Sequence, residues 1–380
     1  MLAHDADLEL FRDNFRRFMA ENIKPHYEQW EKEGLMPRSV WSQLGENGFL
    51  CVDMPEEYGG YGVPTNYSFM LVEEAARAGF GALSTAISCH SEIAAPYILH
   101  IGSEEQKQHW IPRMVTGEVV GAIGMTEPGA GSDLQSMRTS AILQGDHYVL
   151  NGSKTFISNG QHADLVILAA KTDPAARAKG VSLLLVDTHL EGFNKGTNLD
   201  KIGLHSQDTS ELFFDNVKVP ANQLLGNAGQ GFAYLMQELP RERLAIGITA
   251  IGAILGSIDV TTQYVNERQA FGQAIGKFQN TRFVLAQAKI DALATAAFVN
   301  QCTEHYMQGK LDVPTAAAVK AYTTDMQCKI ADSLLQLFGG YGYTTEYPIS
   351  RFYVDARIQR IYGGTNEIMK EIVAREMLGR

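Results

Sequence analysis

The sequence predicts an α+β fold made of three successive parts: helical, then β-rich, then helical again. In the first and last thirds of the 380-residue chain, apolar residues recur with the spacing of amphipathic helices. The middle third instead carries short β-rich runs between Gly, Asn, Asp and Pro. Helices and strands do not alternate along the chain, so a doubly wound parallel sheet is not expected. We therefore predict domains at residues 1–120, 121–228 and 229–380.

The N-terminal part, residues 1–120, has helical spacing from about residue 5 onward. Leu8, Phe11 and Phe15 lie on one predicted helix face. Prolines such as Pro25 and Pro37 interrupt the pattern. We expect a domain of several helices rather than one long helix.

The middle part, residues 121–228, contains β-rich runs with the sequences HYVLNG, KTFISN, DLVILAAKT, GVSLLLVD and ELFFDNVKV. Val, Ile, Phe and Tyr are the residues that pack well on a pleated sheet. Turn-forming residues separate the runs over short distances. This pattern predicts a compact antiparallel β domain.

Helical spacing returns in the C-terminal part over residues 231–265, 278–308, 315–338 and 365–378. Short connections between long helices favour antiparallel neighbours, so we expect a helical bundle. The most apolar run, Leu244 to Ile258, contains three glycines and is shorter than the roughly 18 residues expected of a membrane span. We interpret it as a buried helix.

Composition narrows the possible partners and the compartment. Lys and Arg number 32 against 43 Asp and Glu, for a net charge of −11, which disfavours binding to nucleic acid or an anionic membrane. The four cysteines form no CxxC pair and the N-terminal residues show no targeting pattern. A cytoplasmic protein with reduced thiols is the expectation. The ten histidines form no HExxH or Cys/His cluster, so no metal site is predicted.

Glycine-rich segments give the first indication of a ligand. They are MTEPGAGSD at Met125 to Asp133, RQAFG at Arg268 to Gly272, QLFGGYGY at Gln336 to Tyr343, and IYGGTNEI at Ile361 to Ile368. Any one of them is more simply a tight turn, because glycine is the usual residue there. Glycines also allow a backbone to approach a ligand closely. Four such segments in one chain indicate a large cofactor.

These segments, together with NGSKTFISNG and in this order over nearly the whole chain, resemble the FAD-dependent acyl-CoA dehydrogenase family. The motifs are most similar to those of the long-chain type. The resemblance implies an N-terminal helical domain, a central antiparallel β-barrel and a C-terminal four-helix bundle, assembled as a homotetramer. It also implies conversion of acyl-CoA to trans-2-enoyl-CoA in β-oxidation, by removal of the α proton and hydride transfer to flavin N5. Electron-transfer flavoprotein would be the electron acceptor.

The resemblance also assigns the catalytic base. Most members carry the Glu just before the Gly-Thr of the C-terminal motif, where this chain has Gly363. Long-chain and isovaleryl types place it on the first long helix of the C-terminal domain, and ELPRERL has Glu242 at the matching position. Without the resemblance, Glu242 would be interpreted as a solvated charge between two arginines. Glu238, one turn earlier, is the nearest alternative base.

The remaining site residues follow from the same resemblance. An aromatic wall and a hydroxyl near the flavin ring, a guanidinium on the pyrophosphate and amides at a helix start are the expected contacts. The expected FAD contacts are Ile123, Met125, Thr126, Gly131, Ser132, Phe156, Ile157, Ser158, Arg268, Phe271, Gln279, Gln336, Leu337, Phe338, Gly339, Gly340, Thr365, Asn366 and Glu367. The expected substrate contacts are Ser132, Arg243, Gly363 and Gly364. The segment Gln336 to Gly340 is expected to cross a subunit interface to reach the adenosine half.

Two other functions fit the same motifs. One is an acyl-CoA oxidase or flavin monooxygenase that uses oxygen on the same scaffold. The other is a non-catalytic assembly protein that kept the fold. Acyl chain length and branching depend on the packing of the pocket floor.

Overall fold

Helices form the N-terminal part of the chain, as the apolar spacing predicts. The computed structural model describes residues 5–379. The N-terminal helices are α1 (Ala6–Phe18), η1 (Met19–Ile23), α2 (Lys24–Glu33), α3 (Ser39–Glu46), η2 (Glu56–Tyr58), α4 (Asn66–Arg77), α5 (Gly81–Ile87), η3 (Ser88–Ala94), α6 (Ala95–Ile101) and α7 (Glu104–Val115). Asp5 caps α1, and Phe15 packs against Phe49 at 4.9 Å between ring centroids.

One continuous helical segment, residues 81–101, contains a π-helical stretch in its middle. This stretch, η3, follows α5 directly and precedes α6. It holds the buried side chains Cys89, His90 and Glu92. π-Helical turns are rare and are frequent at functional sites, and η3 lies against strand β1 and helix α8.

The middle part forms one sheet of eight strands. The strands are β1 (Gly121–Gly124), β2 (Ser140–Gln144), β3 (His147–Ser158), β4 (Leu165–Lys171), β5 (Val181–Asp187), β6 (Phe193–Asn198), β7 (Thr209–Pro220) and β8 (Leu224–Leu225), with the short helices η4 (Leu134–Ser136), η5 (Pro174–Gly180) and η6 (Ala221–Gln223) between them. Their order is β6-β7-β3-β2-β4-β5-β8, and β1 pairs with β4.

The predicted closed antiparallel barrel is wrong in two respects. The strand path ends at β6 and β8 without pairing them to each other, so the sheet is open. The edge strand β8 spans only two residues and pairs only with β5, which leaves no ladder long enough to close the sheet. In addition, β1 runs parallel to β4. A long connection between them through β2 and β3 permits this direction.

The centre of the sheet is buried on both faces. Leu165 and Ile167 of β4 pack in one cluster with Tyr97 and Trp110 of the N-terminal helices. The alternating residues of the strand, such as Val166, pack in a second cluster with the other strands. This two-sided burial explains why DLVILAAKT is continuously apolar.

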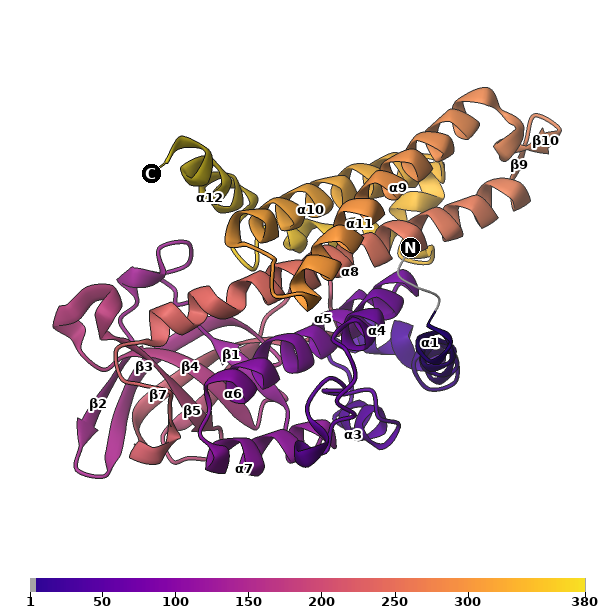
Figure 1. The fold of residues 1–380 in the computed structure, drawn as a ribbon. Coiled ribbons are helices and arrows are strands. Elements are labelled where there is room, and N and C mark those ends of the chain that lie inside the picture. Colours follow the sequence, from indigo (N-terminus) through magenta and orange to yellow (C-terminus); the bar gives the residue numbers. More distant parts are fainter. Residues whose placement is uncertain (1–4, 380) are drawn as a thin grey trace.

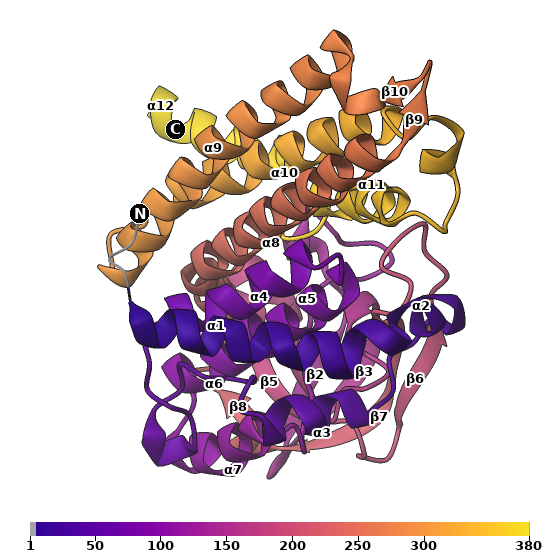
Figure 2. The same ribbon diagram turned by 90° about the vertical axis from the view of Figure 1, so that its right-hand side faces the viewer.

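The C-terminal part is helical again. Its elements are α8 (Gly231–Glu267), β9 (Gln269–Ala270), β10 (Gln273–Ala274), η7 (Ile275–Lys277), α9 (Gln279–Met307), α10 (Val313–Gln336), η8 (Gly339–Tyr343), α11 (Pro348–Gln359) and α12 (Asn366–Leu378). Helices α8 to α11 pack around one apolar cluster, and Figure 2 shows α8, α9 and α10 running side by side above the N-terminal helices. Helix α12 packs separately, on α10. The boundaries after residues 120 and 228 stay predictions.

Helix α8 contacts both the N-terminal helices and the sheet of the middle part. Its most apolar stretch is 72% buried, as predicted for the run Leu244 to Ile258. A Cβ on Gly252 would lie 2.4 Å from the Glu73 carbonyl oxygen of α4, so the glycine permits close helix packing.

Length and composition alone do not distinguish a membrane span from the core helix of a folded protein. Helices α8 and α9 are both long and apolar enough to cross a membrane by length and composition alone. The two helices differ in burial. The apolar stretch of α8 is mostly buried in the protein core, whereas that of α9 is only 22% buried.

Candidate active site

The central residue of the candidate site is Glu242, in the N-terminal half of α8. Its side chain is buried, and Tyr97 on α6 donates a hydrogen bond of 2.9 Å to Oε1. Burial raises the pKa of Glu242 to about 7, although the Tyr97 hydrogen bond and the Arg243 guanidinium act in the opposite direction. A carboxylate with a pKa near neutrality suits proton abstraction.

The alternative base, Glu238, has a different environment. Its carboxylate lies 3.0 Å from Nδ1 of His100, and Gln237 also donates to it. Helix α8 continues through Pro240, so Glu238 and Glu242 are one turn apart on the same helix. Glu238 is therefore already paired with an imidazole, whereas Glu242 faces a phenol.

The glycine turn before α12 lies against the same face of α8. Gly363 has φ of +64°, and a Cβ there would lie 2.4 Å from Cδ1 of Ile246, one turn beyond Glu242. Lys320 of α10 donates to the Gly364 carbonyl at 2.7 Å and anchors this turn. Glu242 and the position expected to hold the family's usual base are thus brought together.

Arg243 directly follows Glu242 in α8. It is only 4% exposed, and burial lowers the pKa of its guanidinium. Its Nε has no hydrogen-bond partner among the residues described. A buried donor without a partner is costly, so this atom is suited to an acceptor on a ligand.

The two predicted flavin segments of the β domain lie side by side. Thr155 donates to the Thr126 carbonyl at 2.9 Å, and Lys154 bonds the Met125 carbonyl and pairs with Glu127. Phe156, the next residue, has φ of +59° and is 67% exposed. A large residue with positive φ is strained, and such strain clusters at ligand sites.

Further residues of these segments share this surface. The pairing register of β3 shifts between Lys154 and Ile157, which turns Phe156 outward while Ile157 stays buried. Ser158 is half-buried at the end of the strand. Gly131 and Ser132 are exposed, and a Cβ on Gly131 would meet nothing within 4 Å.

Cys89 of η3 connects the β domain with Glu242. Its Sγ lies 3.7 Å from the Ser158 carbonyl oxygen. Burial raises the pKa of Cys89 to about 12; the charges of Asp208 and Glu242 add to this, and a backbone hydrogen bond from Ile123 opposes it. Ile123, Ser158 and Glu242 therefore all lie around the π-helical stretch.

At the start of α12, the groups of Thr365 and Asn366 that remain available to a ligand are backbone atoms rather than side chains. Thr365 caps the helix by accepting from the Ile368 amide. The Asn366 side chain is buried and bonds the Ala321 carbonyl and Asp325 of α10. Only the backbone of Asn366 is left for a ligand, whereas Glu367 is exposed.

The remaining predicted cofactor residues gather at the opposite end of the bundle. Arg268 directly follows α8, roughly 39 Å from Glu242 at about 1.5 Å of rise per residue. Figure 1 shows β9 and β10 there, far from α12. One chain therefore does not bring this group to Glu242. Its members are Arg268, Phe271, Gln279, Gln336, Leu337, Phe338, Gly339 and Gly340.

Within this distant group the environments differ. The Arg268 guanidinium lies 5.3 Å from the centroid of the Tyr341 ring, and Phe271 is 95% exposed with positive φ. Phe338 instead stacks on Tyr264 at 4.0 Å and is buried. Phe338 is consequently a core residue in this chain, and the surrounding backbone is what a ligand could contact.

Comparison with known proteins shows the family of this chain. Family models described as acyl-CoA dehydrogenase N-terminal, middle and C-terminal domains match residues 5–118, 122–217 and 229–378. The chain belongs to the acyl-CoA dehydrogenase family. It is 45% identical over 372 residues to the mitochondrial long-chain specific acyl-CoA dehydrogenase of Sus scrofa, covering 97% of this chain and 86% of that protein.

Solved structures of the family have the same fold. An acyl-CoA dehydrogenase from Geobacillus kaustophilus superposes with a TM-score of 0.96 at 46% identity, covering 99% of both chains. A glutaryl-CoA dehydrogenase from Mycobacterium smegmatis in complex with FADH2 gives 0.93 at 28% identity, over 99% and 95% of the two chains. The predicted family, the oxidoreductase class and FAD as the cofactor are confirmed.

Tyr97, Cys89 and Lys320 contact residues of the candidate site, and the sequence did not indicate them. Each lies in a helical stretch of apolar or small residues, where a tyrosine or a cysteine is usually a core residue. Their contacts join residues far apart in sequence, such as Tyr97 and Glu242. No local pattern marks such a pair.

His90, which is fully buried, has a structural role. Nδ1 of His90 accepts from the Gly121 amide, and Nε2 faces the Met114 carbonyl, both at 3.0 Å. Burial lowers the pKa of His90 to about 4, so the ring is neutral. Among residues 5–379, no group of three His, Cys, Asp or Glu side chains is arranged to hold a metal ion.

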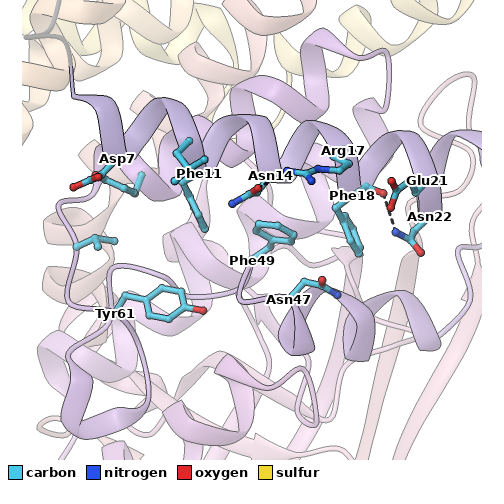
Figure 3. Close-up of a pocket in the computed structure, with 13 residues that line it drawn as sticks. Asp7, Phe11, Asn14, Arg17, Phe18, Glu21, Asn22, Asn47, Phe49 and Tyr61 are labelled. Carbon is cyan, nitrogen blue, oxygen red and sulfur yellow. Dashed lines mark hydrogen bonds between the residues drawn. The ribbon is translucent and has the colours of Figure 1, made fainter.

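A separate groove of about 620 Å³ lies on the outer side of the N-terminal helices. Figure 3 shows Phe11 and Phe18 of α1 facing Phe49, with Tyr61 and Asn47 from the following segment. None of the predicted site residues lines it. The groove is distinct from the candidate active site.

Proposed function

We propose that this protein dehydrogenates acyl-CoA thioesters to trans-2-enoyl-CoA, with Glu242 as the base that removes the α proton. The supporting observation is the buried Glu242 beside a glycine turn that carries no carboxylate. FAD, when bound, supplies the acceptor for the β hydrogen. Burial keeps water from Glu242 and keeps its basicity high.

Geometry favours Glu242 over Glu238. Both oxygens of the Glu238 carboxylate already have hydrogen-bond partners in His100 and Gln237. Position 363 holds no titratable side chain. Glu242 lies one helical turn before Ile246, and Ile246 packs against the Gly363 turn.

Other residues of this chain would bind and orient the ligands. The exposed Phe156 and the open backbone at Gly131 fit an aromatic ring system on this side of the β domain. The unpartnered Nε of Arg243 would donate to the substrate, and the backbone at Gly363 and Gly364 would polarise the thioester oxygen. We assign the FAD contacts in one chain to Ile123, Met125, Thr126, Gly131, Ser132, Phe156, Ile157, Ser158, Thr365, Asn366 and Glu367.

A second copy of the chain would complete the cofactor site. Arg268, Gln279 and the segment 336–340 lie too far along the bundle to reach a flavin bound near their own Glu242. The weakly buried apolar stretch of α9 is a further reason to expect assembly. We therefore propose a homotetramer. Light scattering that gives a monomer with full FAD occupancy would reject it.

We propose long-chain acyl-CoA as the substrate class, because the Sus scrofa relative is named as long-chain specific. Electron-transfer flavoprotein is the proposed acceptor, and a cytoplasmic location stays a prediction. A panel of straight and methyl-branched acyl-CoA thioesters with an artificial acceptor tests the substrate. Rapid oxygen consumption by the reduced enzyme would favour an oxidase instead.

The substitution Glu242→Gln tests the base directly. Gln keeps the volume and can still accept from Tyr97 but cannot take a proton, so flavin bleaching by acyl-CoA should slow by about 10² to 10⁴ or more. FAD content and substrate affinity should change little. Glu238→Gln is the matched control, for which we expect a much smaller effect. Bleaching of Glu242→Gln at the wild-type rate would disprove the assignment.

A further inference from the structure

Tyr97 contacts the carboxylate of Glu242 from a different part of the fold. It lies on α6, and its side chain is fully buried. Its hydroxyl donates to Oε1 of Glu242 at 2.9 Å across 145 positions of sequence. Within residues 5–379 this is the one hydrogen bond that the Glu242 carboxylate receives.

We propose that Tyr97 is a positioning residue that fixes Glu242 by Oε1, leaves Oε2 for the substrate proton and keeps the carboxylate ionised. This inference rests on the proposed role of Glu242 as base. A hydrogen bond to the charged form of an acid favours that form, and bonds to charged partners are among the strongest. Tyr97 thus acts against the burial that favours a protonated Glu242.

The phenol is a fixed donor in this pair. Burial and the nearby Glu242 charge hold the pKa of Tyr97 well above its usual range, so it stays protonated. It cannot itself remove the α proton. Its contribution is therefore orientation and proton affinity rather than chemistry on the substrate.

Other titratable groups around Glu242 make no hydrogen bond to it among residues 5–379. On α8, Arg243 favours the carboxylate and Glu238 disfavours it. From η3, the Cys89 thiol is close enough to Glu242 for that charge to raise its pKa slightly, and burial keeps the thiol neutral. From α10, Lys320 interacts with Arg243. A substitution at Tyr97 leaves these other groups in place. The resulting change in the pKa of Glu242 can therefore be assigned to the lost hydrogen bond.

The test is the pH profile of flavin bleaching at saturating acyl-CoA for Tyr97→Phe holoenzyme. Losing a bond to a charged group should move the limiting pKa upward by about one to two units. The rate at low pH then falls by about 10- to 100-fold and returns toward the wild-type value at high pH. Tyr58→Phe is the matched control, because Tyr58 also donates to a carboxylate, Glu104 at 2.9 Å, in the N-terminal helices.

A second variant covers the case in which Tyr97→Phe does not fold. Replacement of Tyr97 by 3-fluorotyrosine retains the shape and gives a stronger donor, so the limiting pKa should move downward. An unchanged pKa in both variants, or an equal loss of rate at every pH, would overturn the inference. A wrong assignment of Glu242 as the base would give a different result. In that case the flavin of Glu242→Gln would be bleached at the wild-type rate.

Discussion

At the scale of single residues, the environment of Glu242 predicts a pH dependence. Its pKa is raised to about 7 by burial, and only the ionised form can take a proton. The kcat/KM of the wild-type enzyme should therefore rise about tenfold per pH unit below 7 and level off above it. Steady-state assays with acyl-CoA between pH 5 and 9 measure this. A flat profile across that interval would contradict a base with this pKa.

Substitution of Gly363 should destabilise the fold for two reasons, backbone strain and a steric clash, which a control glycine can separate. An alanine there would be strained by positive φ and would also contact Ile246. Gly309 has φ of +67° but would meet nothing within 4 Å. Gly309→Ala should cost about 1 to 2 kcal/mol for the backbone alone, and Gly363→Ala should cost more. Urea unfolding of both variants decides this, and equal losses would show that the Ile246 contact is unimportant.

Single residues also show where sequence reasoning is sufficient. Glu242 and the Gly363 turn could be proposed as members of one site because each belongs to a short motif, and the structure places the Gly363 turn against Ile246, one turn from Glu242. Tyr97 could not, since its role depends on α6 crossing α8. The separation of Arg268 from Glu242 equally depends on the length of α8 and not on the RQAFG motif.

At the scale of elements, a buried ion cluster joins α8 to the N-terminal helices. Nη2 of Arg241 lies 2.7 Å from both Asp53 and Glu92, and all three side chains are at most 5% exposed. Burial raises the pKa of Glu92 and Arg241 opposes this. The cluster holds η3 next to the turn of α8 that carries Glu242.

Removing the cation should leave two buried carboxylates without a positive charge beside them. We expect Arg241→Gln to lower the free energy of unfolding by about 3 to 5 kcal/mol. Adding Glu92→Gln should recover part of this loss, because one unpaired charge is removed. Denaturant unfolding of both single variants and the double variant measures the coupling. A loss below about 1 kcal/mol for Arg241→Gln would contradict the expectation.

The elements themselves were predicted unevenly. Long helices and the strands β3, β4, β5 and β7 follow from their apolar patterns. Strand β6 has the sequence FNKGTN, which lacks alternation, and β8 has two residues. Such strands form because neighbours offer a free edge. The π-helical form of η3 likewise has no sequence signal.

At the scale of the whole molecule, Asp355 joins all three parts of the chain. It lies on α11, and Oδ1 accepts from the Leu204 amide of the middle part at 2.6 Å. A Cβ on Gly81 of the N-terminal helices would lie 2.9 Å from its Oδ2. Burial raises the pKa of Asp355 to about 7, and Glu31 adds to this.

This raised pKa gives stability a definite pH dependence. Below about pH 4 Asp355 is protonated in both the folded and unfolded states. Between about 4 and 7 only the unfolded state ionises, so the contribution of Asp355 to folding falls as pH rises and is constant above 7. Asp355→Asn should therefore gain stability relative to wild type across that interval. Urea unfolding at several pH values checks it, and a constant difference would contradict it.

The arrangement of the strands and helices in space was harder to predict than their order along the chain. The order of α, β and α parts follows from composition and period. Whether the sheet closes depends on the edge strands β6 and β8, whose lengths no apolar pattern reports.

The distance between Glu242 and Arg268 along α8 has a consequence for dilute solutions. If two chains are needed for each cofactor, cofactor retention becomes a function of protein concentration by mass action. FAD and chain association would then strengthen each other by the same factor. We expect dilution to release FAD together with the loss of assembly, and added FAD to restore both. Each long helix would thus tie the cofactor content of one subunit to the presence of its neighbour.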